Sequence, residues 1–122
     1  TNDIMLNSAQ TNVSGSYNST TYKFTAPVAG VYCFMINAYV RLETHDDDSN
    51  HAYVFLRKNG LTYINSMAIY GYYNSGDVDQ TQNVCMIMTM AKDDYATAAL
   101  NAASGDASVY RGATTFSGFL MG

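Results

Sequence analysis

The stretch that decides the fold is Phe24-Thr25-Ala26-Pro27-Val28-Ala29-Gly30-Val31-Tyr32-Cys33-Phe34, which holds the only proline of the 122-residue chain. Proline fixes φ and removes an amide donor, so we expect a strand to end before Pro27 and the chain to turn through Gly30. Beyond the turn, the residues of one face are all apolar: Tyr32, Phe34, Ile36, Ala38, Val40 and Leu42. A period of two over residues 31–42 predicts a long strand with this face in the core, and not a helix.

The opposite face of this strand is mixed. Its residues are Val31, Cys33, Met35, Asn37, Tyr39 and Arg41. The half near Cys33 and Met35 is apolar, and the face becomes typical of a solvated surface only at Arg41. A half-apolar outer face indicates a contact with another subunit.

The rest of the chain also has the pattern of short strands. Asn59-Gly60 predicts a hairpin between residues 52–58 and 61–70, because a type I′ turn needs positive φ at both central positions. Residues 84–90 alternate again, Asp93-Asp94 marks a turn, and residues 95–102 are interpreted as a strand of small residues. Strands at 109–111 and 115–121 complete a set of about eight to ten. This spacing is typical of an all-β sandwich or jelly roll.

Composition narrows the class of partner. Only 13% of residues are charged and the net charge is −4, with no basic cluster, which disfavours binding to nucleic acid or to an anionic membrane. No apolar run reaches the ~18 residues of a membrane span. Cys33 and Cys85 fit neither a disulfide framework nor a metal knuckle. We interpret them as two buried small hydrophobes, with a single disulfide as the alternative.

Several short motifs, in order and over residues 12–120, together resemble the globular head domain of complement component 1q and its tumour-necrosis-factor-like relatives. They are Lys23-Phe24-Thr25-Ala26-Pro27, Gly30-Val31-Tyr32 followed by Phe34, Leu56-Arg57-Lys58-Asn59-Gly60 and Phe116-Ser117-Gly118-Phe119-Leu120. The family usually has a Gly-Asp pair where this chain has Asp93-Asp94. Because Asp adopts the left-handed conformation less readily than Gly, the tightness of this turn is in doubt.

The resemblance implies a ten-stranded jelly-roll β-sandwich that assembles as a homotrimer, with aromatic and apolar residues of one sheet along the threefold axis. It makes Met35, Tyr39, Phe119 and Met121 the candidates for the trimer interface. It also implies one head domain over residues 1–122, expected to be the C-terminal part of a longer stalked or fibre protein.

The most acidic segment, residues 45–51, raises the question of a metal. Asp46, Asp48 and Asn50 have the spacing of the first, third and fifth ligands of a calcium loop. His51 and Arg57 stand where an EF-hand needs Gly and Glu, so the segment is not an EF-hand. A solvated loop tip is the simpler interpretation. Bound Ca²⁺ is the alternative, since the family holds calcium in apical loops with Asp ligands.

A tyrosine-rich segment gives the best candidates for ligand contact. Tyr72 and Tyr73 flank a turn next to Asn74, and Asp77 and Asp79 form a second acidic loop. Tyrosine rings stack on sugar faces and anchor protein partners at low entropy cost. The alternative is that the rings pack at a strand end.

No catalytic constellation is present in the sequence, which has only two His, both in the acidic segment, and no phosphate-binding loop. The sequence therefore predicts a non-enzymatic trimeric recognition head. It would bind a surface glycan or protein through apical loops, outside the cell or at the tip of a virion (phage) fibre. The alternative is a structural trimerisation or capping module for a collagen-like or fibre shaft.

Overall fold

The computed structural model describes residues 2–5, 16–42, 50–65, 69–71, 78–102 and 107–122. Within these ranges the structure is almost entirely strand, with one short 3₁₀ turn (η2, Arg111–Ala113). The strands are β1 (Asn2–Asp3), β2 (Tyr17–Asn18), β3 (Lys23–Thr25), β4 (Gly30–Leu42), β5 (Asn50–Lys58), β6 (Leu61–Asn65), β7 (Ile69–Gly71), β8 (Val78–Met90), β9 (Tyr95–Ala102), β10 (Ala107–Val109) and β11 (Thr115–Leu120).

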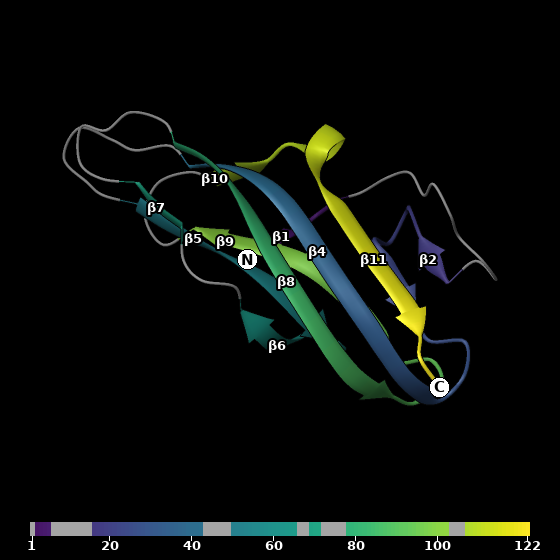
Figure 1. The fold of residues 1–122 in the computed structure, drawn as a ribbon. Helices are drawn as coiled ribbons and strands as arrows, with labels where there is room; N and C mark the ends of the chain where they lie inside the picture. Colours follow the sequence, from purple (N-terminus) through teal and green to yellow (C-terminus); the bar gives the residue numbers. More distant parts are fainter. Residues whose placement is uncertain (1, 6–15, 43–49, 66–68, 72–77, 103–106) are drawn as a thin grey trace.

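The strands form two antiparallel sheets (Figure 1). The larger sheet has the order β2-β3-β9-β5-β6, with β1 added to β9 and β7 added to β5. In the smaller sheet β8 lies along one side of β4, and β10 and β11 pair with successive parts of its other side. Strands far apart in sequence are therefore neighbours, which confirms the predicted jelly-roll sandwich. The described strands include very short ones, so the count differs slightly from the expected ten.

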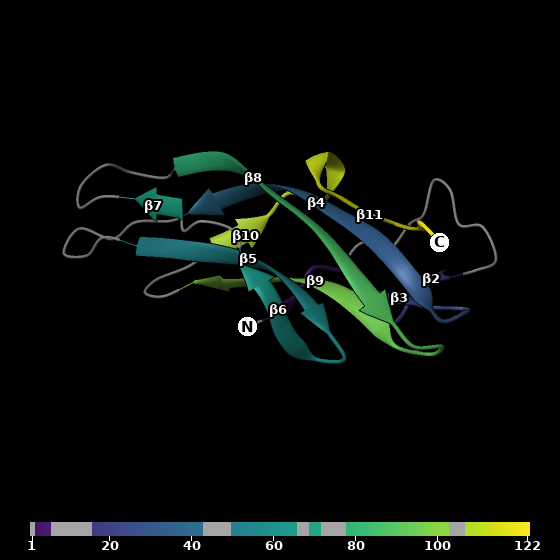
Figure 2. The same cartoon turned by 60° about the horizontal axis from the view of Figure 1, so that its bottom comes forward.

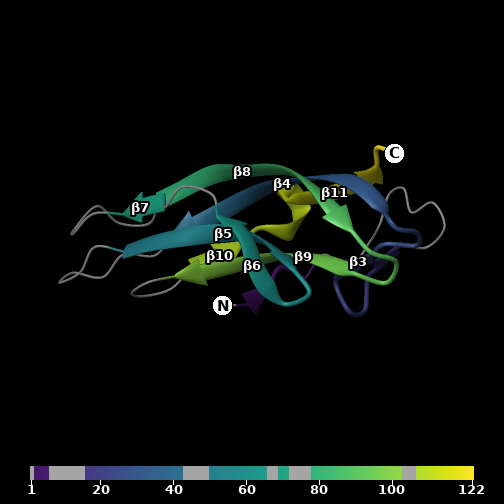
Figure 3. The ribbon, with the colours of Figure 1, turned by 90° about the horizontal axis from the view of Figure 1, so that it is seen from below.

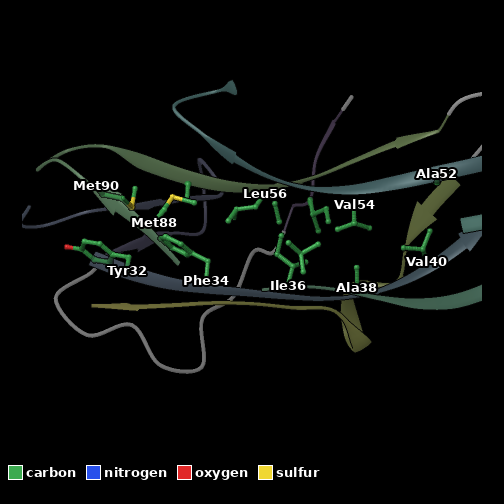
Figure 4. Close-up of a cluster of buried hydrophobic side chains, with 14 of the residues drawn as sticks. Tyr32, Phe34, Ile36, Ala38, Val40, Ala52, Val54, Leu56, Met88 and Met90 are labelled. Atoms are coloured by element: carbon green, nitrogen blue, oxygen red, sulfur yellow. The ribbon is translucent and has the colours of Figure 1, made fainter. Parts of the chain in front are cut away.

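The two sheets pack face to face as layers, as Figures 2 and 3 show from two sides. The core between them contains the predicted apolar face of β4, which meets Val54 and Leu56 of β5 and Met88 and Met90 of β8 (Figure 4). All six residues of that face, from Tyr32 to Leu42, are 1% exposed or less. The period of two in the sequence therefore identified the core strand correctly, because alternate side chains of a strand point to opposite faces.

Aromatic rings fill the end of the core that lies next to the turn at Pro27. Phe24 packs edge-on against Tyr32 and Phe34, with ring centroids 5.8 and 5.1 Å apart. Phe34 also stacks with Phe116 of β11 at 5.9 Å. The Tyr32 hydroxyl donates a 2.7 Å hydrogen bond to the carbonyl of Val28, which ties the core to the turn.

Two turns interlock at this end of the molecule. Asn59 and Gly60 have φ of 51° and 80°, which fits the predicted hairpin turn. The Asn59 side chain accepts a 2.9 Å bond from the Tyr95 amide and donates a 3.0 Å bond to the Asp94 carboxylate. That carboxylate also accepts the Ala91 amide at 2.8 Å. These bonds to Asn59 and Ala91 lower the pKa of Asp94.

The Asp93-Asp94 turn forms despite the missing glycine. Asp93 has φ of 72°, in the left-handed region. Its amide donates to the Ala26 carbonyl at 2.9 Å, and the Ala26 amide donates to the Asp94 carbonyl at 2.8 Å. The turn is tight because this reciprocal pair holds Asp93 in a conformation that its own side chain disfavours.

Replacing Asp93 by Gly is expected to stabilise the fold. Glycine adopts positive φ without steric cost, so Asp93→Gly should raise the free energy of unfolding by about 0.5–1 kcal/mol after the added entropy of the unfolded chain is counted. The measurement is the midpoint of urea unfolding at constant slope. Ala91→Gly, in the same turn, serves as the control and should not stabilise. A lower midpoint for Asp93→Gly would show that the carboxylate of Asp93 matters more than its backbone.

Some predicted boundaries were wrong. Asn50 belongs to β5 and Asp79 to β8, although both were expected in loops. β10 ends at Val109, and Arg111 begins the 3₁₀ turn instead of ending a strand. Residues 61–65 and 69–71 form separate strands that pair with different parts of β5. Where pairing ends depends on the partner strand as well as on the residues of the strand itself, so the local pattern could not fix these boundaries.

Candidate functional site

The outer face of the smaller sheet carries the residues of interest. The alternate residues of β4 that do not enter the core lie here, and the register places residues of β8 and β11 beside them. Cys33 lies opposite Ile87 and Phe119, Met35 opposite Cys85 and Ser117, and Arg41 opposite Asp79 and Ser108. The face therefore divides along the strands into an apolar half and a polar half.

The apolar half contains four large exposed side chains: Met35 is 40% exposed, Ile87 52%, Phe119 51% and Met121 53%. Met121 lies beside Val31, since its amide donates to the Val31 carbonyl at 2.7 Å. Three of the four are predicted interface residues, and the register brings them together on one surface. A contiguous group of this kind is typical of a protein contact, whereas single exposed apolar residues are not.

The polar half centres on an ion pair with an added phenol. Arg41 donates to the two oxygens of Asp79 from Nε at 2.8 Å and from Nη2 at 3.0 Å. The hydroxyl of Tyr39 donates to the same carboxylate at 3.0 Å. The guanidinium first, and then the phenol, lower the pKa of Asp79, and the bond to the carboxylate raises the pKa of Tyr39. The carboxylate is therefore fixed as an anion whose charge is offset by Arg41.

A pocket of about 550 Å³ adjoins this group, lined by Tyr39, Arg41, Ser108, Val109, Tyr110 and Ala113. The rings of Tyr39 and Tyr110 meet edge to face, 6.0 Å apart at 70°. Tyr110 is 65% exposed, which is unusual for so large a ring. The pocket therefore presents an aromatic surface and a guanidinium to solvent.

Buried Thr114 holds the wall of this pocket in place. Its hydroxyl accepts the Tyr39 amide at 3.0 Å and donates to the Tyr110 carbonyl at 2.8 Å. The Tyr110 amide donates to the Tyr39 carbonyl at 2.9 Å. The 3₁₀ turn that follows Tyr110 is thus bonded to β4, so the backbones of the two tyrosines keep a fixed spacing.

The predicted ligand-contact residues are placed only in part. Tyr72, Tyr73, Asn74 and Asp77 lie outside the described residues. Asp79 is described, and it belongs to the polar half of the outer face. Tyr39, predicted for the trimer interface, bonds to Asp79 at the boundary of the two halves. Arg41 and Tyr110 were not predicted as site residues. Arg41 could have been identified from its position on the outer face of β4, whereas no feature of the sequence indicated Tyr110.

The predicted metal site lies mostly outside the described residues. Asp46 and Asp48 lie outside the described residues, and of Asn50 only the backbone, paired with Gly71, is described. Across the described ranges, no group of three or more His, Cys, Asp or Glu side chains is arranged to hold a metal ion. Calcium in the acidic segment stays a prediction.

The interpretation of the cysteines needs correction. Cys33 is half-buried and Cys85 is exposed, and both are free thiols on the outer face. The expectation of two buried small hydrophobes was wrong because both residues occupy the outward positions of their strands.

Comparison with known proteins identifies the family. The family model described as "C1q domain" matches residues 1–121. The chain belongs to the C1q domain family. It is 31% identical, over 120 residues, to Complement C1q tumor necrosis factor-related protein 3 of Mus musculus and to the protein of the same name of Homo sapiens. Each match covers 97% of this chain and 44% of the relative, so the chain spans less than half the length of these curated relatives.

Family membership confirms the resemblance found in the motifs and agrees with the two packed sheets of this C1q domain. The matches lend no support to a virion fibre or to calcium. In the described part of the chain, the structure has no helix with the length and apolar character needed to cross a membrane.

Proposed function

We propose that this C1q domain is a non-enzymatic recognition module that acts outside the cell as a homotrimer and binds a surface glycan or protein. The observation that carries the proposal is the division of one sheet face into an exposed apolar half and a polar half with an aromatic pocket. The two halves have different chemistry, so they suit two different partners. The coarse assignment, a ligand-binding module, follows from the family.

The apolar half is proposed as the trimer interface. Met35, Phe119 and Met121 would pack about the threefold axis, with Ile87 beside them and Tyr39 at the margin. Burying these side chains removes apolar area from water, which contributes about 25 cal/mol per Å². A C1q domain of this size has few charges to keep such a face solvated as a monomer.

The polar half is proposed as part of the ligand site. An exposed tyrosine ring gives a flat surface for a sugar face or a protein side chain. Tyr72, Tyr73, Asn74 and Asp77 precede β8 in sequence, and we propose that they extend the site beside Asp79. Asp46, Asp48 and Asn50 are proposed ligands of a bridging Ca²⁺. Three copies would compensate for a weak single site through avidity.

All 122 residues are proposed to form one head of a longer protein, since the curated relatives extend well beyond the matched part. The trimer and an extracellular ligand are its proposed partners. We do not propose nucleic acid as a partner, and we do not propose that the domain inserts into a membrane.

Tyr110→Ala tests the ligand site. The trimer is applied to a printed glycan array and to cultured cells before and after enzymatic removal of surface glycans. We expect the variant to bind about tenfold more weakly, because losing an aromatic contact that the bound ligand covers costs on the order of 1–2 kcal/mol of binding free energy. The double variant Tyr72→Ala, Tyr73→Ala should weaken binding in the same way.

Leu61→Ala is the matched control, since Leu61 is 74% exposed on the other sheet and its loss should leave binding unchanged. Binding that survives glycan removal would assign a protein ligand. A wild-type trimer that binds neither array nor cells would contradict recognition and favour the capping module.

A further inference from the structure

The turn between β2 and β3 carries a motif that the proposed function does not use. Asn18-Ser19-Thr20 is an Asn-X-Ser/Thr triplet without proline, the acceptor sequence for attachment of an oligosaccharide to an asparagine amide. Asn18 is the last residue of β2 and pairs with Lys23 of β3, so the triplet opens a hairpin turn at the edge of the larger sheet (Figure 2). All three of its residues are exposed. Because such triplets also arise by chance in a chain rich in Asn, Ser and Thr, the structure of the turn decides whether this one fits the reaction.

The side chain of Asn18 is held by its own turn. Its Oδ1 accepts hydrogen bonds from the backbone amides of Thr20 at 2.8 Å and Thr21 at 3.0 Å, which makes an Asx turn. The Asn18 carbonyl accepts a bond from the Tyr22 amide at 2.7 Å. These bonds join residues within the range 18–22, so the turn can form locally, before the two sheets have assembled.

The same bonds leave the amide nitrogen of Asn18 accessible. Both donors to the side chain are backbone N–H groups, so the accepting atom is the oxygen and not the nitrogen. Nδ2 lies on the other side of the amide carbon, and no described residue accepts a hydrogen bond from it. The hydroxyl of Thr20 likewise has no partner in the described part of the chain. The nucleophile and the hydroxyl that the triplet requires are therefore both available to an enzyme.

The surroundings leave room for an attached oligosaccharide. Tyr17, the preceding residue, packs edge-on against Phe116 with ring centroids 6.1 Å apart, so β2 is anchored on one side while Asn18 points to the other. β2 belongs to the larger sheet, whereas the proposed trimer interface and the aromatic pocket lie on the outer face of the smaller sheet. An oligosaccharide on Asn18 is therefore attached to a different sheet from both surfaces. It also adds solvation to a chain in which only 13% of residues are charged.

We propose that Asn18 is a site of N-linked glycosylation. The proposal rests on the extracellular location in the proposed function, because the transferase and its donor, an oligosaccharide on a lipid diphosphate, belong to the secretory pathway. Nδ2 of Asn18 forms a bond to the anomeric carbon of the first sugar, and the bond from that carbon to the diphosphate oxygen breaks. The lipid diphosphate leaves with the bonding electrons, and one amide proton passes to a base of the enzyme. Nothing is oxidised or reduced.

A second triplet, Asn12-Val13-Ser14, lies outside the described residues and is no part of the proposal. The sequence has no third triplet of this kind. Asn12→Gln removes the second one, so every variant is made in that background, and any oligosaccharide that remains is on Asn18.

The test is secretion of the chain, behind a signal peptide, from cultured mammalian cells, followed by digestion with peptide N-glycosidase in water labelled with heavy oxygen. We expect the intact mass to fall by one oligosaccharide, with the label retained at position 18 of the tryptic peptide that ends at Lys23. Thr20→Ala should abolish the mass loss, although Asn18 and the backbone amide of residue 20 remain. Thr20→Ser and Ser19→Ala are matched controls that keep the triplet and should keep the oligosaccharide.

Two results would overturn the proposal: a secreted chain with no oligosaccharide on Asn18, or a Thr20→Ala variant that still carries one. If the chain is retained in the cells, translation in the presence of microsomal membranes gives the same mass readout. A secreted chain that binds its ligand but is unmodified would contradict the glycosylation alone. Modification of Asn18 in a chain that binds neither glycan array nor cells would contradict the recognition function and leave the glycosylation in place.

Discussion

Phe119→Asp is expected to convert the proposed trimer into monomers. Phe119 is half exposed and lies opposite Cys33 in the middle of the apolar half, so three copies would meet near the threefold axis. Three carboxylates buried there would repel one another and lose their hydration, at a cost of several kcal/mol each. Light scattering after size exclusion should show three chain masses for the wild type and one for the variant.

Leu61→Asp is the matched control for this change. Among the described residues, Leu61 is the most exposed of the large apolar side chains, at 74%, but it lies on β6 of the other sheet. The Leu61→Asp variant should remain trimeric. Running both variants with and without EDTA separates a metal-dependent assembly from an apolar one. A monomeric wild type, or a Phe119→Asp variant that remains trimeric, would contradict the proposed interface.

Gly118→Ala is expected to destabilise the fold strongly. A Cβ at this position would lie 2.5 and 2.6 Å from two ring carbons of Phe34, its partner across β4 and β11. Phe34 is 1% exposed and fixed between Phe24 and Phe116, so the ring has nowhere to move. Overpacking of this kind costs about 1–3 kcal/mol or more in the free energy of unfolding. Urea unfolding monitored by tyrosine fluorescence measures the loss.

Gly112→Ala is the control, because its Cβ would meet only the exposed ring of Tyr110, at 3.3 Å, which can move aside. It should change the unfolding free energy by less than about 0.5–1 kcal/mol. The double variant Gly118→Ala, Phe34→Leu should recover part of the loss, as a non-additive coupling between residues in contact. Equal costs at Gly118 and Gly112 would contradict the packing argument.

Much of the fold was predictable because its signals are local. The alternation after Pro27 identified β4 and its buried face, and Asn59-Gly60 identified the hairpin. Both follow from the residue's own conformational preference or from the period of a single strand. Asp93 shows the limit of this reasoning. Its residue type argued against a tight turn, but hydrogen bonds to Ala26, distant in sequence, impose one.

The candidate site was predictable only in part. The outer face of β4 indicated a subunit contact, and the family resemblance pointed to Phe119 and Met121, which the structure places beside it. Asp79 was expected in a loop, yet it lies on β8 and bonds to Arg41. Tyr110 carried no sequence signal, because its exposure depends on the turn that follows it.

The sequence by itself determined that this is an all-β C1q domain with a long buried central strand and few charges, since period, turn chemistry and motif order are properties of the chain. Only the tertiary structure decided which side chains share a surface: Arg41 with Asp79, Tyr39 with Tyr110, and Cys33 with Cys85 and Met35. These pairs depend on how segments roughly 40 to 70 residues apart are aligned, and a shift of one residue in the register of a strand would turn all of its side chains to the other face.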